Sequence, residues 1–138
     1  MFQMTKKIYD VLMQEDLKVF TEEDETRSAV WLSFGIDNGG SYRIKFVSTD
    51  DDNDVAVRIF GLISVNDEQK PAILNAINEL NAKYRFIKIC CDEDGDVNVE
   101  YDFPTDCSHP EDSAKEILIR FVRFVDEAYP ILMRALWS

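Results

Sequence analysis

The sequence contains little of what most catalytic and metal sites are made from. Its 138 residues include one histidine and three cysteines, so any histidine-based site must use His109. The segment Cys107-Ser108-His109 offers two ligands, whereas zinc takes three or four from a protein. We therefore expect no catalytic residue, no metal site and no cofactor.

A small enzyme that uses Cys107 and His109 is the alternative interpretation. Cysteine–histidine catalysis also needs a third group that orients the histidine, and spacing alone does not show one. We interpret His109, which precedes Pro110, as part of the start of a helix. The neighbours Cys90 and Cys91 lie in an extended segment, so their side chains should point to opposite faces and pack as small apolar groups. Three cysteines make a poor disulfide framework, which fits a reducing cytoplasm.

Membrane and export signals are also missing. No apolar run approaches the roughly 18 residues that suggest a membrane span. Lys6 and Lys7 are followed by Tyr9 and Asp10 rather than by the apolar stretch of an export signal. Basic residues are scarce, with 15 Lys and Arg against 27 Asp and Glu and a net charge of −12. We expect a soluble cytoplasmic protein that binds neither nucleic acid nor anionic membrane, since an acidic chain repels phosphate.

What the sequence does contain predicts one folded domain over residues 1–138. The hydrophobic fraction is 46%, enough for a single core in a chain of this length. Apolar residues recur at helical spacing in three segments. The first is Lys6 to Met13, with Thr5 as its cap. The second is Asn66 to Tyr84, with Asn66 or Asp67 as its cap and Pro71 in the opening turn. The third is Ser113 to Trp137, which is opened by a capping box at Ser113 or by Pro110 one turn earlier, and which Pro130 should kink or restart.

Period-two alternation predicts two hairpins and a strand between them. A three-residue loop at 38–40 would set Phe34 opposite Ile44, and a loop at 93–95 would set Ile89 opposite Val99 and Cys91 opposite Val97. Both loops end in glycine, which adopts the left-handed conformation that such loops need. The strand from Val55 to Ile63 should turn Val55, Val57 and Ile59 inward.

These elements give an α+β fold in the order α-β-β-β-α-β-β-α. Clean alternation favours a five-stranded antiparallel sheet with helices on one face. The acidic residues 22–25 are expected in a solvated loop before the first strand.

Several segments also carry a family resemblance. They are Ile77-Asn78-Glu79-Leu80-Asn81, the strand Arg85 to Cys91, the turn Asp94-Gly95-Asp96, the strand Val97 to Phe103, Tyr129-Pro130 and Gly40-Ser41-Tyr42. Together they resemble the YbjN family of putative bacterial sensory transduction regulators, whose fold is similar to that of type III secretion chaperones. The resemblance implies a cytoplasmic, non-enzymatic regulatory or chaperone-like role.

Two acidic runs partly match the pattern of calcium-binding loops. Asp50 to Asp54 begins like a calcium loop, but Val55 stands where glycine is required and Gly61 where glutamate is required. Asp92 to Asp96 fails at the same two places, with Val97 and Phe103. We interpret both as charged turns, and a calcium-responsive protein is kept as a further alternative.

The last helical segment is apolar over more of its circumference than a surface helix needs. The residues beyond the expected stripe would form a homodimer or partner interface, unless the sheet and the first helix cover them. We assign to this interface Phe124, Tyr129, Ile131, Met133 and Trp137.

The outer face of the sheet gathers basic and aromatic residues in an acidic chain. Lys88 should lie opposite Glu100, whereas Arg43 and Lys45 lie on the strand next to Arg58. This face is either a docking surface for an acidic or extended partner segment, or a solvated face neutralised by the acidic loops. The candidate contact residues are Trp31, Arg43, Lys45, Arg58, Phe60 and Phe86. The sequence thus favours a non-enzymatic, homodimeric regulatory or chaperone-like module that binds another protein.

Overall fold

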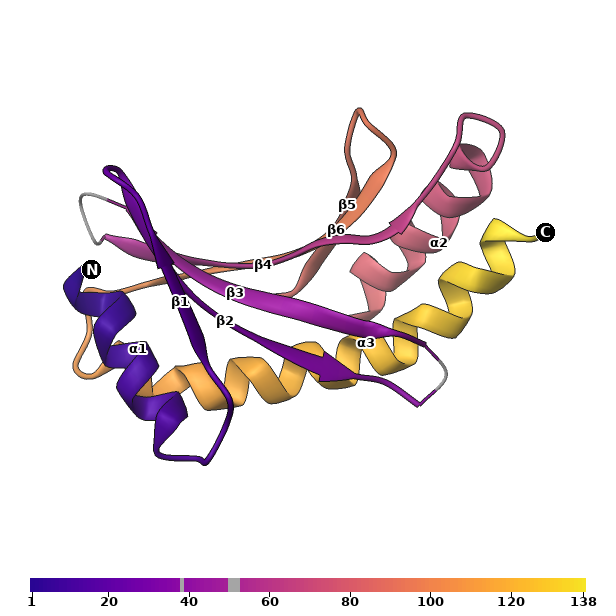
Figure 1. Cartoon of the computed structure of the whole chain (residues 1–138). Coiled ribbons are helices and arrows are strands. Elements are labelled where there is room, and N and C mark those ends of the chain that lie inside the picture. The colour runs from indigo at the N-terminus through magenta and orange to yellow at the C-terminus, as the bar shows by residue number, and fades with distance from the viewer. Residues whose placement is uncertain (38, 50–52) are drawn as a thin grey trace.

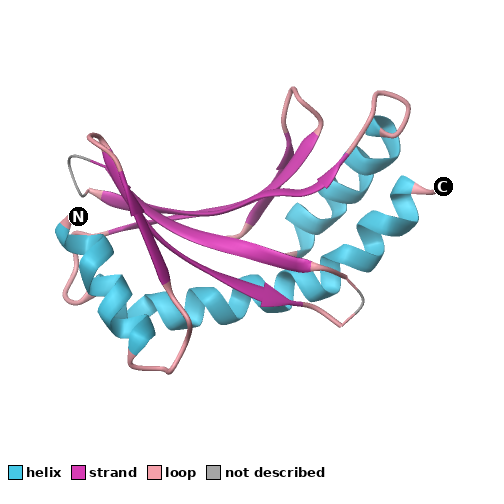
Figure 2. Cartoon of the chain, viewed as in Figure 1, coloured by secondary structure: helices cyan, strands magenta, loops and turns pink. Residues whose placement is uncertain are grey.

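The computed structural model describes residues 1–37, 39–49 and 53–138, which form one antiparallel sheet with helices along one face (Figures 1 and 2). The sheet has six strands in the order β1-β2-β3-β4-β6-β5. The elements, in chain order, are α1 (Gln3–Met13), β1 (Phe20–Glu23), β2 (Arg27–Gly35), β3 (Ser41–Thr49), β4 (Asp54–Ser64), α2 (Lys70–Lys83), β5 (Lys88–Cys91), β6 (Asp96–Pro104), the 3₁₀ turn η1 (Pro110–Ser113) and α3 (Ala114–Leu136). The α+β class and the antiparallel sheet are confirmed. The predicted count of five strands and the predicted order α-β-β-β-α-β-β-α are wrong, because four strands rather than three lie between α1 and α2.

The missed strand is β1, which includes half of the acidic segment expected as a loop. Glu22 pairs with Ala29 of β2, and Phe20 pairs with Trp31. All four residues of β1 are exposed, so burial imposes no alternation on this strand. The ring of Phe20 stacks on Trp31 with centroids 4.4 Å apart.

The hairpin of β5 and β6 has the predicted register. Ile89 lies opposite Val99, and Cys91 lies opposite Val97. Gly95 closes the loop with φ +86, and a β-carbon there would lie 2.2 Å from the carbonyl oxygen of Val65. Glycine is therefore required twice, by backbone conformation and by space. The predicted strand from Arg85 is shorter than expected, because β5 begins at Lys88.

The hairpin of β2 and β3 has a different register from the predicted one. Phe34 lies opposite Tyr42 rather than Ile44, which pairs with Leu32. β2 therefore ends at Gly35 and β3 begins at Ser41, and Gly40 does not adopt a left-handed φ. Aromatic packing accounts for this register, since the ring of Tyr42 lies 6.2 Å from that of Phe34 and 6.1 Å from that of Tyr129 in α3.

The first two helices differ from prediction at their starts. α1 begins at Gln3, so Thr5 is not a cap but a buried residue whose Oγ1 lies 2.6 Å from Oγ of Ser28. Before α2, the N–H of Gln69 donates to Oδ1 of Asn66 and the N–H of Asn66 donates to Oε1 of Gln69. Asn66 thus caps the turn that leads into α2, and Pro71 lies in the opening turn as predicted.

Helix α3 runs beneath the sheet and links its two ends (Figure 1). Phe121, Val125 and Leu132 are fully buried along its length. The helix is preceded by η1, which starts at Pro110, and Ser113 forms no side-chain cap, so the earlier opening is the correct alternative. Pro130 lies inside a continuous helix and does not restart it. None of the helices in the described residues is long and apolar enough to cross a bilayer.

The inward face of the sheet forms the core, as the alternation predicted. Val55, Val57 and Ile59 of β4 are at most 1% exposed. At Gly61 the register of β4 against β6 shifts, so that Ile59 pairs with Val99 but Ile63 pairs with Val97. The bulge leaves Phe60 on the outer face while Leu62 and Ile63 stay buried.

Candidate binding surfaces

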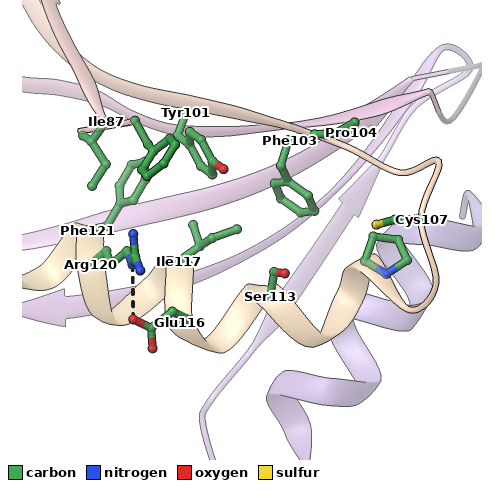
Figure 3. A pocket seen from close by; sticks show the side chains of 12 residues that line it. Ile87, Tyr101, Phe103, Pro104, Cys107, Ser113, Glu116, Ile117, Arg120 and Phe121 are labelled. Carbon is green, nitrogen blue, oxygen red and sulfur yellow. Dashed lines mark hydrogen bonds and ion pairs between the residues drawn. The ribbon is translucent and has the colours of Figure 1, made fainter.

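An apolar groove of about 400 Å³ lies between β6 and the first half of α3. Figure 3 shows Tyr101 and Phe103 pointing down from the sheet toward Ile117 and Phe121 of the helix. Glu116 and Arg120 lie on the helix side of the groove and form an ion pair of 3.1 Å. The lining is completed by Phe86, Ile87, Pro104, Cys107, Pro110 and Ser113. Grooves of this kind, mainly apolar with a few polar groups, are typical binding sites.

The groove lies where the sheet becomes one strand narrower. β5 pairs with β6 only as far as Lys88 opposite Glu100. Beyond that point residues 101–104 of β6 pair with β4 alone. This end of β6 is therefore a sheet edge, and the groove lies directly beside it.

Phe86 stands at the end of this edge in an uncommon backbone conformation. Its φ is +70, and the N–H of Ile87 donates to the carbonyl oxygen of Arg85 at 2.8 Å, which makes a γ-turn. A left-handed φ is unusual for a bulky side chain and costs backbone energy. The turn interrupts the alternation that predicted Phe86 on the outer sheet face. Instead its side chain is 67% exposed, lines the groove, and lies 6.2 Å from the ring of Tyr101.

The outer edge of β5, in contrast, is covered by α2. The side-chain amide of Asn81 donates to the carbonyl oxygen of Ile89 at 2.8 Å and accepts from its N–H at 2.9 Å. One amide group therefore satisfies both backbone groups that Ile89 turns away from β6. Asn81 belongs to a segment that carries the family resemblance, and the structure gives it this role.

The outer face brings together most of the predicted basic and aromatic residues. Lys45 lies opposite Arg58, and Lys88 lies opposite Glu100, as predicted. Lys45 Nζ is 2.8 Å from Glu22 of β1, while Arg58 reaches Glu100 at 3.1 Å and Asp102 at 2.7 Å. The balancing carboxylates thus come from other strands of the sheet, β1 and β6, rather than from loops.

The remaining residues of this face are more accessible. The guanidinium carbon of Arg43 lies 4.2 Å from the ring centroid of Trp31, a cation–π contact. Arg43 is exposed, and Phe60 is 59% exposed. Trp31 contacts both the ring of Phe20 and Arg43, and it is half-buried.

The residues predicted as an interface on α3 occupy different environments. Phe124 is 1% exposed and contacts the ring of Tyr84, at 4.9 Å, so it belongs to the core rather than to a surface that a partner could touch. Tyr129, Ile131 and Met133 are half-buried against the core. Trp137 is 78% exposed. Tyr84, directly after α2, and Tyr42 of β3 therefore cover part of the apolar excess predicted for this helix.

Cys107 and His109 both lie before α3 but form no contact with each other within the described residues. His109 has φ +52 and is exposed, with Nδ1 3.5 Å from Oε1 of Glu111. Cys107 is exposed and lines the groove. In the described part of the chain no group of three possible metal ligands occurs.

The other acidic and thiol groups take part in local structure. Burial, the neighbouring Glu100 and its hydrogen bond raise the pKa of Cys90 to about 11. Burial also raises the pKa of Cys91, whose side chain packs against the core on the opposite face. Asp92 accepts hydrogen bonds from the N–H groups of Asp94 and Asp96. Of the other predicted turn, residues 50–52 lie outside the described residues.

Sequence reasoning did not identify the groove. The alternation places Tyr101 and Phe103 in a strand, and helical spacing places Ile117 and Phe121 on the apolar stripe of a helix. Neither pattern indicates a space between the strand and the helix. The available signal was the run Tyr101 to Pro104, because a proline at the end of a strand marks an edge.

Comparison with family models matches residues 6–132 to YbjN, described as "Putative bacterial sensory transduction regulator". The match includes every segment that carried the resemblance. A comparison with curated proteins gave no match.

Proposed function

Since the chain belongs to the YbjN family of putative bacterial sensory transduction regulators, we propose that it is a non-enzymatic regulatory module that binds another protein in the cytoplasm. The observation that supports this proposal is the apolar groove of about 400 Å³ with the exposed ring of Phe86 at its edge. Large exposed aromatic side chains beside an apolar hollow are typical of protein-binding surfaces.

The outer sheet face is a second contact surface in this proposal. Arg43 and Phe60 are exposed there, and Trp31 offers a rigid aromatic surface. Lys45 and Arg58 already have carboxylate partners within the chain. Their side chains would therefore orient a bound partner more than attract it by charge. A homodimer would use the exposed end of α3 around Trp137 and the half-buried Tyr129, Ile131 and Met133.

The proposal is tested by affinity capture from the native cytoplasm with the full chain and three surface variants. Phe86→Ala, Arg43→Glu and Trp137→Ala each change an exposed side chain, so each should remain folded. We expect the wild type to retain a partner protein in stoichiometric amount and at least one variant to lose it. If the wild type captures only the proteins that an unrelated acidic protein also captures, the proposal is contradicted.

Light scattering tests the dimer separately. A chain of 16.0 kDa should give about twice that mass, and Trp137→Ala should reduce it. A wild-type mass of one chain at working concentration would remove the homodimer while leaving the protein-binding role intact.

A further inference from the structure

We infer that the groove binds an extended segment of the partner protein, which adds to β6 as a strand and inserts apolar side chains between β6 and α3. This inference rests on the proposed function and specifies the chemistry of the partner. The segment would carry apolar residues at alternate positions and basic residues beside them.

The first argument concerns the backbone of β6. The N–H of Asp92 donates to the carbonyl oxygen of Asp96 at 2.9 Å, so Asp96 turns its backbone toward β5. Successive residues of a strand direct their backbone groups to alternate edges. Asn98, Glu100 and Asp102 therefore face the same edge as Asp96. Since the pairing of β5 with β6 reaches only Glu100, opposite the first residue of β5, Asp102 presents its N–H and carbonyl where no strand pairs among the described residues.

The second argument is that this edge and the groove coincide. Tyr101 and Phe103 point toward α3, where Ile117 and Phe121 face them (Figure 3). A strand placed beside Asp102 would have every second side chain directed to the same side as those of Tyr101 and Phe103. Those side chains would enter the groove, while backbone hydrogen bonds fix the register. This combination is how strand addition obtains both affinity and specificity.

The third argument is the difference between the two neighbouring edges. Asn81 occupies both backbone groups of Ile89, which blocks pairing along β5. Proteins cover exposed edges in this way to prevent unwanted pairing. Among the described residues no such cover of the edge at Asp102 occurs, and beside this edge stands the exposed Phe86 in a strained turn.

Charge selects the kind of segment. Around the groove, residues 100–120 contain more acidic than basic side chains, and the whole chain has a net charge of −12. Arg120, which lines the groove, is already paired with Glu116. A segment with lysine or arginine beside its apolar residues would be attracted, whereas an acidic segment would be repelled.

The test begins with a displayed library of segments about ten residues long, the usual upper length of a strand. Apolar residues vary at alternate positions, with lysine or threonine between them. Selection on the full wild-type chain should yield segments that Phe86→Ala binds about tenfold more weakly. Leu74→Ala is the control, because it removes a large apolar side chain that is 50% exposed on α2, away from the residues that line the groove, and it should bind like the wild type.

The selected segment is then made as a synthetic peptide in two methylated forms. One carries N-methyl groups on the odd residues and the other on the even residues, so that each form blocks one edge of the strand. We expect one form to lose about tenfold in affinity and the other to bind like the parent, as loss of backbone bonds at a single edge requires. Equal binding by both forms would overturn strand addition.

Three other outcomes would also overturn the inference. One is a library that yields no binder sensitive to Phe86→Ala. Another is that no peptide binds, whereas laurate binds to the wild type and not to Phe86→Ala. This result would make the groove a small-ligand pocket. The third is a homodimer that Phe86→Ala dissociates, which would make a second copy the occupant. If instead Arg43→Glu or Trp137→Ala loses the captured cytoplasmic protein while Phe86→Ala retains it, only strand addition fails and the proposed function stands.

Discussion

The amide of Asn81 and the backbone of Ile89 form a closed pair of hydrogen bonds, 2.8 Å and 2.9 Å long, between α2 and β5. This pair ties the middle helix to the edge of the sheet through the two backbone groups of the buried Ile89 that face away from β6. The two residues lie on either side of the short connection between α2 and β5, so the pair also holds that connection.

Replacing Asn81 with alanine should therefore destabilise the fold. It leaves the N–H and carbonyl of Ile89 without their partner, at an expected cost of about 1–3 kcal/mol. Asn78→Ala changes an exposed asparagine of the same helix and should cost less than about 0.5 kcal/mol. Urea denaturation of the two variants compares them directly, and equal midpoints would show that the pair contributes nothing.

Gly95→Ala should be among the most damaging single substitutions. It combines a left-handed φ with a β-carbon 2.2 Å from the carbonyl oxygen of Val65, so the hairpin must shift. We expect a loss above about 3 kcal/mol, because both strain and steric overlap contribute. Gly61→Ala has a similar φ of +66 but meets nothing within 4 Å, and should cost about 1 kcal/mol. Thermal melts of both variants separate the two effects, and similar melting temperatures would contradict the role of Val65.

Asp92 should make stability depend on acid pH. Hydrogen bonds from the N–H groups of Asp96 and Asp94 and from Asn98 hold the pKa of its carboxyl below the usual value. A lowered folded pKa means that this contribution is present above the unfolded pKa of about 4 and is lost as the pH falls through the folded pKa.

The variant Asp92→Asn should accordingly lose less stability than the wild type between pH 5 and pH 3, when each is compared with its own value at pH 7. Asp94→Asn, in the same loop, is the control and should follow the wild type. Denaturation midpoints at several pH values measure this, and parallel curves for all three proteins would rule out a contribution from Asp92.

The three thiols should react with Ellman's reagent in two phases at pH 8. Cys107 is exposed and should react first. Cys90 should be slow because burial, helped by Glu100, raises its pKa to about 11, which leaves about one thiolate in a thousand at this pH. Cys107→Ser should remove the fast phase, and Glu100→Gln should quicken Cys90. A fast phase that survives Cys107→Ser would contradict this assignment.

Sequence patterns predicted the elements whose residues are buried on one face. Val55, Val57 and Ile59 alternate because one side of β4 faces the core, and the register at Ile89 and Val99 followed from the same rule. β1 escaped prediction because all four of its residues are exposed, so no alternation marks it. The register at Phe34 was missed because it depends on Tyr129, which is distant in sequence but packs against Tyr42.

The candidate site was harder to predict than the fold. Pairing charges across strands placed Lys88 beside Glu100 correctly, but the partner of Lys45 comes from the strand that was not foreseen. The groove depends on a turn at Phe86 that delays the start of β5 to Lys88, and a left-handed phenylalanine has no local sequence signal. The position of the groove follows from where the sheet becomes one strand narrower beside α3, which depends on the whole fold.

The place of α3 after all six described strands has a consequence during synthesis. All six strands described here leave the ribosome before the helix whose Phe121, Val125 and Leu132 fill the space beneath them. The growing polypeptide must therefore carry a sheet whose apolar face lacks these three side chains until α3 has been made, and its final collapse awaits this one helix.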